Sequence, residues 1–270
     1  FYGYNQENKT LYYQSTEQSP LQRDIYSINV FGKKKKILSE NRGSNNADFS
    51  KNYKYFINTH SSANKPNTIT LCNAKGKSLR LIKKSEKLTE KLQEYKLTKK
   101  EFFDFKTEQG INLNGWMMKP VDFDENKKYP VLMYVYGGPG SQTVKDSWGG
   151  HYMWYQMLCQ QGYIVVSIDN RGTGGRGSEF KKCTYKELGK LETIDQIEGA
   201  KYLSNLNYID NNRIGIWGWS YGGYMSSLCI LKGSNFFNTA IAVAPVTNWR
   251  FYDTIYTERY MQTPQENPNG

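Results

Sequence analysis

Residues 213–223 read Arg-Ile-Gly-Ile-Trp-Gly-Trp-Ser-Tyr-Gly-Gly, and this stretch decides the fold. It begins as a short apolar run typical of a buried strand and continues into an apolar helical pattern that ends near Leu231. Between the two, residues 218–222 fit the motif G-x-S-x-G, in which a strained strand-to-helix turn lifts the serine hydroxyl clear of the sheet. The stretch therefore predicts a nucleophilic serine at Ser220.

Strand and helix patterns alternate on both sides of this stretch, from about residue 98 onward. Strands are expected at 101–106, 111–118, 129–136, 163–168, 213–218 and 239–243, and helices at 151–161, 193–206 and 221–231. Such alternation is typical of a mostly parallel sheet with helices on its faces. The serine turn then lies at the carboxyl end of one of the parallel strands.

The first third of the chain has a different pattern, because residues 10–82 read as short strands separated by turns. Their spacing resembles the four-stranded blades of a β-propeller, with room for about two blades. Two blades cannot close a ring, so a small independent β-domain is an equal alternative on this stretch alone. The charged residues 84–97 are expected to form a short helical connector, which divides the chain into domains at 1–97 and 98–270.

Composition indicates a folded protein whose surface is rich in lysine. The chain has 270 residues, an aromatic fraction of 15% and a net charge of +11. The lysines are spread through loops and form no basic helix, so a solvated surface is favoured over nucleic-acid binding.

The cysteines and the chain ends carry less information. The four cysteines are widely spaced without a C-x-x-C pair, so we expect neither a zinc site nor a disulfide framework, and no cofactor. No apolar run has membrane-spanning length. The chain begins at Phe1 without Met or a signal-like segment, which we interpret as a sign that it is cut from a longer protein.

A nucleophilic serine that transfers acyl groups also needs hydrogen-bond donors aimed at the developing oxyanion. The backbone N–H of Tyr221, directly after the nucleophile, is the first candidate. The second is expected from residues 136–140, Tyr-Gly-Gly-Pro-Gly, which leave the end of an earlier strand. A loop N–H or the Tyr136 hydroxyl could serve, and the residues alone do not choose between them.

Residues 172–177 match the motif G-x-G-x-x-G of dinucleotide-binding proteins. However, residues 169–171 separate these glycines from the preceding strand, and the acidic Glu192 and Asp195 fall in an expected helix rather than at the end of a second strand. A loop beside the active site is therefore favoured over a cofactor site.

Four motifs together resemble the prolyl oligopeptidase family, and within it the dipeptidyl peptidase branch. They are residues 134–142 (Tyr-Val-Tyr-Gly-Gly-Pro-Gly-Ser-Gln), 169–174 (Asp-Asn-Arg-Gly-Thr-Gly), 218–225 (Gly-Trp-Ser-Tyr-Gly-Gly-Tyr-Met), and 244–249 (Ala-Pro-Val-Thr-Asn-Trp) followed by aromatic residues up to 261. The resemblance implies an incomplete α/β-hydrolase fold in residues 98–270. It also implies that residues 1–97 are the last blades of a β-propeller.

The resemblance assigns roles to individual residues. It makes Ser220 the acylated nucleophile, gives the Tyr221 N–H and the Tyr136 hydroxyl to the oxyanion hole, and thereby chooses between the two alternatives above. The residues that it places around the apolar pocket for proline or alanine are Val246, Trp249, Tyr252 and Tyr256. A flat aromatic slot favours a compact pyrrolidine ring.

The activity implied is that of a serine exopeptidase, which releases N-terminal dipeptides after proline or alanine through an acyl-enzyme intermediate. Its substrates would be peptides with proline or alanine at the second position. The family branch also implies a possible homodimer and an exported, periplasmic or membrane-anchored location, although the residues themselves leave the compartment open.

Part of the machinery is expected to lie outside these residues. The triad of this fold runs Ser, then Asp or Glu, then His, yet the two histidines, His60 and His151, both precede Ser220. Asp253 follows Ser220 but falls inside the pocket motif. The acidic pair that holds the substrate amine is expected in upstream propeller sequence, so we expect this segment alone to be inactive.

Two other functions fit the same sequence. An oligopeptidase or acylaminoacyl peptidase of the same family is favoured if the upstream propeller lacks the acidic pair. A non-catalytic interaction protein with this fold is favoured if no Asp and His follow, although Ser220 argues against it.

Overall fold

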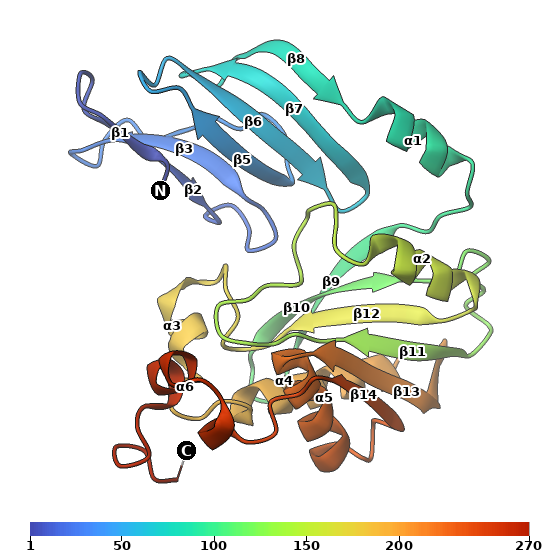
Figure 1. Ribbon diagram of the computed structural model, residues 1–270. Coiled ribbons are helices and arrows are strands. Elements are labelled where there is room, and N and C mark those ends of the chain that lie inside the picture. Colours follow the sequence, from blue (N-terminus) through green and yellow to red (C-terminus); the bar gives the residue numbers. More distant parts are fainter. Residues whose placement is uncertain (270) are drawn as a thin grey trace. The chain divides into compact units, whose positions relative to one another are not determined.

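The computed structural model describes residues 1–269, which form two compact units (Figure 1). The first unit comprises Phe1–Leu97 and Lys145–Tyr152, and the second comprises Thr98–Val144 and the residues from Met153 onward. Residues 145–152 belong to the first unit because Asp146 joins two of its segments. The Asp146 N–H donates to the carbonyl of Leu21 (2.8 Å), and its carboxylate accepts from the Ala63 N–H (2.7 Å).

The first unit contains two four-stranded antiparallel sheets and one helix. The first sheet has the order β1 (Gly3–Asn5), β2 (Thr10–Ser15), β3 (Asp24–Asn29), β4 (Lys36–Ile37), and the second has the order β5 (Ser44–Phe49), β6 (Tyr55–Ser62), β7 (Lys65–Asn73), β8 (Ser78–Lys84). Helix α1 (Glu86–Gln93) follows β8, where the sequence predicts a helical connector. The predicted antiparallel strands are confirmed, and each sheet has the four strands of a propeller blade.

Strand β5 was not predicted, because its residues are Ser-Asn-Asn-Ala-Asp-Phe and lack an apolar alternation. Its second residue, Asn45, is fully buried, and the amide of this side chain replaces apolar packing with hydrogen bonds. The Asn45 side chain donates to the carbonyls of Arg23 (3.1 Å) and Asn41 (2.9 Å) and accepts from the Asn58 side chain (3.0 Å). A buried amide whose partners are all supplied can occupy a strand position that a sequence pattern reserves for apolar residues.

The second unit is built around a six-stranded mixed sheet. In spatial order its strands are β14 (Thr239–Val243), β13 (Ile209–Trp219), β11 (Tyr129–Tyr134), β12 (Ile164–Asp169), β10 (Asn112–Met118) and β9 (Lys100–Lys106). The first four run parallel to one another, whereas β10 is antiparallel to both β12 and β9.

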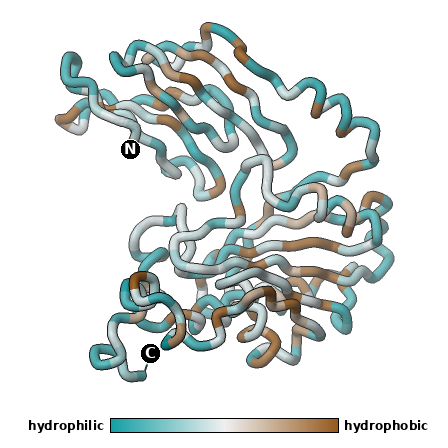
Figure 2. The backbone as a smooth tube through the Cα atoms, in the orientation of Figure 1, coloured by the Kyte–Doolittle hydropathy of each residue, from teal (hydrophilic) through white to brown (hydrophobic). Residues whose placement is uncertain are grey.

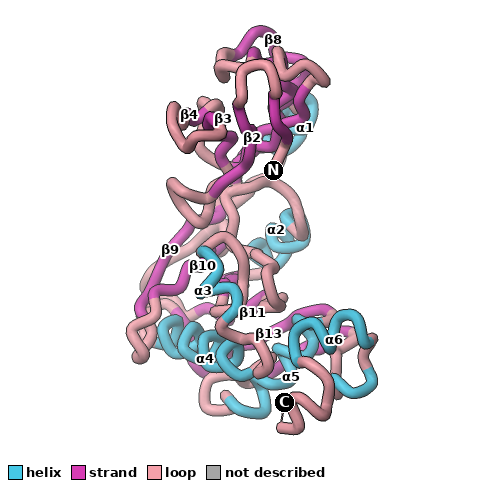
Figure 3. The backbone as a smooth tube through the Cα atoms, turned by 90° about the vertical axis from the view of Figure 1, so that its left-hand side faces the viewer, coloured by secondary structure: helices cyan, strands magenta, loops and turns pink. Residues whose placement is uncertain are grey.

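The helices of the second unit follow the parallel strands in the sequence. Figure 3 draws these helices in cyan, with α4 and α5 below the labels of β11 and β13. They are α2 (Tyr152–Gln160), α3 (Gly177–Lys182), α4 (Lys190–Ser204), α5 (Tyr221–Lys232), the 3-10 turn Trp249–Phe251 and α6 (Thr254–Met261). The order of strands and helices is that of an α/β hydrolase, so the predicted fold class is confirmed. Helix α4 begins three residues before its predicted start. Its first turn contains Glu192, whose carboxylate accepts from the backbone N–H of Gly189.

The core of the second unit lies between the sheet and helices α4 and α5. Along β11 buried residues alternate with half-buried ones, and Val131 and Met133 lie in this core. Figure 2 shows hydrophobic stretches along β12 and α5. Gly199 lets α4 approach the sheet closely, because a β-carbon there would lie 2.4 Å from Cδ1 of Ile168.

The order of the strands brings two loops together. Strands β11 and β13 are parallel neighbours, with Tyr134 opposite Trp217. Because the carboxyl ends of parallel strands meet at the same edge of the sheet, Tyr136 and Ser220 follow adjacent strand ends.

None of the helices within residues 1–269 has the length and apolar character that a membrane span requires.

Candidate active site

Ser220 lies between β13 and α5 in a strained backbone conformation. Its φ of 58° and ψ of −116° are sparsely populated by residues with a side chain. Two hydrogen bonds hold it there, because the Ser220 N–H donates to the carbonyl of Val243 (2.9 Å) and its own carbonyl accepts from the Tyr224 N–H (3.1 Å). Ser220 itself is only half-buried. The turn thus presents the serine at the carboxyl edge of the sheet.

The glycines around Ser220 are required by the approach of β11. A β-carbon on Gly218 would lie 2.3 Å from the carbonyl oxygen of Val135, and one on Gly222 would lie 2.2 Å from the same atom. A β-carbon on Gly223 would lie 2.7 Å from the carbonyl oxygen of Val243. The backbone of Val135 therefore packs directly against the serine turn, residues 218–222.

The loop that follows β11, residues 136–144, is held at both ends by side chains at the carboxyl end of β12. The Asn170 side chain donates to the carbonyl of Gly137 (3.0 Å). The buried Asp169 carboxylate accepts from the backbone N–H groups of Thr143 (2.9 Å) and Val144 (3.0 Å). These contacts fix the loop that carries Tyr136 beside the serine turn.

Aromatic rings form a continuous cluster next to Ser220. The Tyr221 ring contacts that of Tyr136 (6.1 Å between ring centroids) and that of Trp249 (5.7 Å). Trp249 is stacked on Tyr256 (5.9 Å), and Tyr252 makes edge contacts with both (5.8 Å and 5.4 Å). These residues come from the end of β11, the start of α5, the 3-10 turn and α6.

Residues of this cluster line part of a small hollow. It has a volume of about 160 Å³, and Trp249, Tyr252 and Met261 are among the residues that line it. Val246, between β14 and the 3-10 turn, is buried.

Burial raises the pKa of the Tyr136 hydroxyl above its ordinary value, and the neighbouring Tyr252 and Tyr260 hydroxyls add to the rise. A tyrosine is protonated at neutral pH even at its ordinary pKa, and the raised pKa lets Tyr136 remain a hydrogen-bond donor to a higher pH. The pKa of Tyr256 is raised for the same primary reason.

A buried carboxylic acid, Glu192, contacts the residue that follows Ser220. The Tyr221 hydroxyl donates to Oε1 of Glu192 (2.7 Å), and the Gly189 N–H donates to Oε2 (3.1 Å). Glu192 is 0% exposed, and burial raises its pKa to about 7 against the two hydrogen bonds, which lower it. Asp195, three residues along α4, adds a smaller rise.

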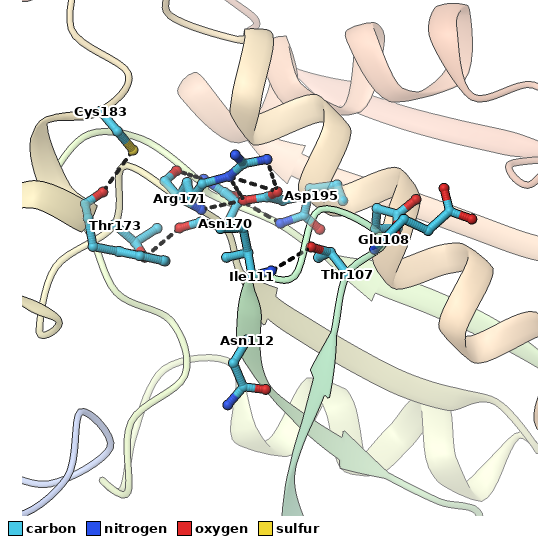
Figure 4. Close-up of polar contacts among 12 residues, drawn as sticks. Thr107, Glu108, Ile111, Asn112, Asn170, Arg171, Thr173, Cys183 and Asp195 are labelled. Carbon is cyan, nitrogen blue, oxygen red and sulfur yellow. Dashed lines mark hydrogen bonds and ion pairs between the residues drawn. The ribbon is translucent and has the colours of Figure 1, made fainter.

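Asp195 forms a buried ion pair with Arg171, as Figure 4 shows. The Arg171 guanidinium donates to the carboxylate through Nη2 (2.6 Å) and Nε (3.0 Å), and the Arg171 backbone N–H donates to the same carboxylate (2.7 Å). Burial raises the pKa of Asp195, although Arg171 opposes this rise. The pair joins the loop after β12 to α4.

The residues singled out in the sequence fall into two groups. Ser220, Tyr221 and Tyr136 lie at adjacent strand ends, and Trp249, Tyr252 and Tyr256 join them through ring contacts. The two histidines lie in the first unit, and His60 contacts the carbonyl of Arg42 through Nε2 (2.8 Å).

Residues 172–177 form the loop before α3, where the Gly174 N–H donates to the carbonyl of Ser141 (2.8 Å). This contact places the glycine-rich segment against the loop after β11. Across residues 1–269, no three His, Cys, Asp or Glu side chains are grouped so that they could hold a metal ion.

Sequence reasoning missed the support that α4 gives to the site. Glu192 and Gln196 are buried polar residues one turn apart on this helix, and with Asp195 they contact the loops that surround Ser220. The available signal was a set of acidic and amide residues within an expected helix, and such residues usually mark a solvated face.

Comparisons with known proteins agree with this geometry. Residues 151–270 match the model of the prolyl oligopeptidase family, and residues 1–67 match that of the dipeptidyl peptidase IV N-terminal region. The chain belongs to the prolyl oligopeptidase family. It is 47% identical to the crystal structure of Porphyromonas gingivalis dipeptidyl peptidase 4, with a TM-score of 0.95 over 100% of this chain and 38% of that one.

Two curated relatives show the same pattern. A Botryotinia fuckeliana protein named "Probable dipeptidyl-aminopeptidase B" is 38% identical over 98% of this chain and 29% of its own length. Dipeptidyl peptidase 8 of Mus musculus is 36% identical over 98% of this chain and 31% of its own length. The chain therefore spans about a third of the length of these members of the family.

The first prediction concerns the contact between Val135 and the serine turn. Gly222→Ala places a β-carbon 2.2 Å from the Val135 carbonyl oxygen, and neither backbone can move without disturbing the turn. We expect the free energy of unfolding to fall by about 3 kcal/mol, measured by urea denaturation. Ser227→Ala, on the same helix, adds no atom and should change it by about 1 kcal/mol or less. Equal effects of the two substitutions would contradict the close approach.

The second prediction concerns Glu192. Between pH 4.5 and about 7 the folded protein holds a proton on Glu192 that the unfolded chain has lost, so the free energy of unfolding contributed by this group falls as pH rises through that window. Glu192→Gln removes this contribution. We expect the stability of the wild type relative to the variant to fall by about 3 kcal/mol from the acid to the alkaline side of the window. A difference that does not vary with pH would show that Glu192 titrates normally.

Proposed function

We propose that these residues belong to a longer serine exopeptidase that releases dipeptides from free N-termini after proline or alanine. The observation that carries the proposal is the position of Ser220 in a strained turn beside the Tyr136 loop and the aromatic cluster around Trp249. The family supports a serine peptidase, and the relatives above carry the names of dipeptidyl peptidases.

In this proposal Ser220 Oγ attacks the carbonyl carbon of the second substrate residue. The C–O bond forms as the hydroxyl proton passes to a general base, and the carbonyl oxygen becomes an oxyanion. The Tyr221 N–H and the Tyr136 hydroxyl, which is protonated at neutral pH, donate to that oxyanion. Collapse breaks the C–N bond and protonates the leaving amine, and water then hydrolyses the acyl-enzyme.

The aromatic cluster supplies the specificity. Trp249, Tyr252 and Tyr256 offer ring faces and edges, and Val246 offers a short apolar side chain. Such a site accepts the flat pyrrolidine ring of proline or the methyl group of alanine and gains little from a long flexible side chain.

The general base and the anchor for the substrate amine are proposed to come from other parts of the longer protein. No histidine follows Ser220 in the 270 residues, and the members of the family compared above are about three times as long as this chain. A serine without its base is a weak nucleophile, so we propose that the segment by itself is inactive.

The third prediction tests this function in the full-length protein. We expect cleavage of a Gly-Pro chromogenic substrate with a free amine and no cleavage of its N-blocked counterpart. Ser220→Ala should lower the rate by at least about 10³-fold, because the nucleophile is lost.

Cleavage of both substrates would identify an oligopeptidase or acylaminoacyl peptidase instead. Cleavage of neither, by a folded protein, would favour a non-catalytic interaction protein.

A further inference from the structure

Helix α4 carries two buried polar side chains, one turn apart, that are linked by hydrogen bonds to the two segments with the proposed oxyanion donors, one directly and one through Asn170. Glu192 accepts from the Tyr221 hydroxyl (2.7 Å), and the Gln196 side chain donates to Oδ1 of Asn170 (2.9 Å). The Asn170 amide in turn donates to the carbonyl of Gly137, the residue after Tyr136 (3.0 Å). Glu192 and Gln196, from which these two series of hydrogen bonds start, lie on the same face of α4.

The residues that make these contacts are buried and shielded from water. Glu192, Gln196 and Asn170 are each 0% exposed, and Tyr221 is 2% exposed. A buried hydrogen bond has a fixed geometry because no water competes for its partners, and loss of one partner leaves the other unsatisfied. Gln196 also donates to the carbonyl of Ile168 (2.9 Å), which fixes its amide against β12.

The consequence for the reaction follows from covalent geometry. The Tyr221 backbone N–H is the proposed oxyanion donor, and the ring of the same residue is held at its far end by Glu192. The Tyr136 hydroxyl is the other proposed donor, and its loop is held at Gly137 by Asn170. Donors that stabilise an oxyanion must be fixed before the charge develops, and a misplacement of about 1 Å can cost about 10²-fold in rate.

We propose that Glu192 and Gln196 are positioning residues, through which α4 holds the two oxyanion donors at a fixed distance from Ser220. The inference rests on the proposed function and assigns to α4 a role in the chemical step rather than in substrate binding. Neither residue touches the reacting atoms. The fixed partners of Glu192 are the Tyr221 hydroxyl and the Gly189 N–H, one from α5 and one from the start of α4 itself.

The experiment compares kinetic constants of full-length variants. Tyr221→Phe keeps the ring and the backbone N–H but removes the hydroxyl that contacts Glu192, so we expect kcat to fall by about 10- to 100-fold with KM changed by less than about twofold. Glu192→Gln and Gln196→Met should lower kcat in the same way. The double variant Glu192→Gln/Tyr221→Phe should lose little more than Tyr221→Phe alone, because both substitutions act on the same contact between Glu192 and Tyr221.

A matched control separates positioning from general stability. Tyr129 is a buried tyrosine at the start of β11, and its hydroxyl accepts from the Asp124 N–H (2.8 Å). Tyr129→Phe also removes one hydrogen bond of a tyrosine hydroxyl, but at the opposite end of the same sheet. It should lower the melting temperature about as much as Tyr221→Phe while leaving kcat within about twofold of the wild type.

Rates of inactivation by a fluorophosphonate distinguish failure of this inference from failure of the proposed function. The reagent reacts with an activated serine whatever its peptide substrate, and negative charge develops on its phosphoryl oxygen. We expect Tyr221→Phe to slow inactivation by about 10- to 100-fold, even if the wild type does not cleave Gly-Pro substrates. Unchanged inactivation and unchanged kcat in a folded Tyr221→Phe protein, or an equal loss in Tyr129→Phe, would overturn the inference.

Discussion

The carbonyl oxygen of Val135 lies against Gly218 and Gly222, where no β-carbon fits. This contact sets the distance between the end of β11 and the serine turn, and the rest of the site depends on it. The adjacent parallel strands bring the two loops to one edge of the sheet, but only the absence of side chains at these glycines lets the backbones touch. The strained backbone of Ser220 lies between these two glycines in the sequence.

Around this contact the protein places polar groups where most cores are apolar. Asp169 and Asn170 hold the loop after β11, Arg171 and Asp195 join the loop after β12 to α4, and Glu192 holds Tyr221. Buried polar groups with full sets of partners specify one arrangement more strictly than apolar packing does. A site that must place two donors and a nucleophile benefits from that strictness.

Sequence patterns predicted the sheet of the second unit because its strands are apolar and its helices are long enough to show their period. They also indicated Ser220, since glycine spacing around a serine has a direct steric meaning. They failed for β5, where Asn45 replaces an apolar residue, and for α6, where tyrosines line a short helix. They missed Glu192, because a charged residue is expected at the surface and only its tertiary partners make it a buried one.

The central claim is that Ser220 is an activated nucleophile, and the site of covalent modification tests it most directly. The full-length protein would be treated with a fluorophosphonate, digested, and its adduct located by mass spectrometry. We predict a single major adduct on the Ser220 hydroxyl, absent in Ser220→Ala. An adduct on another residue, or labelling that persists unchanged in Ser220→Ala, would contradict the account.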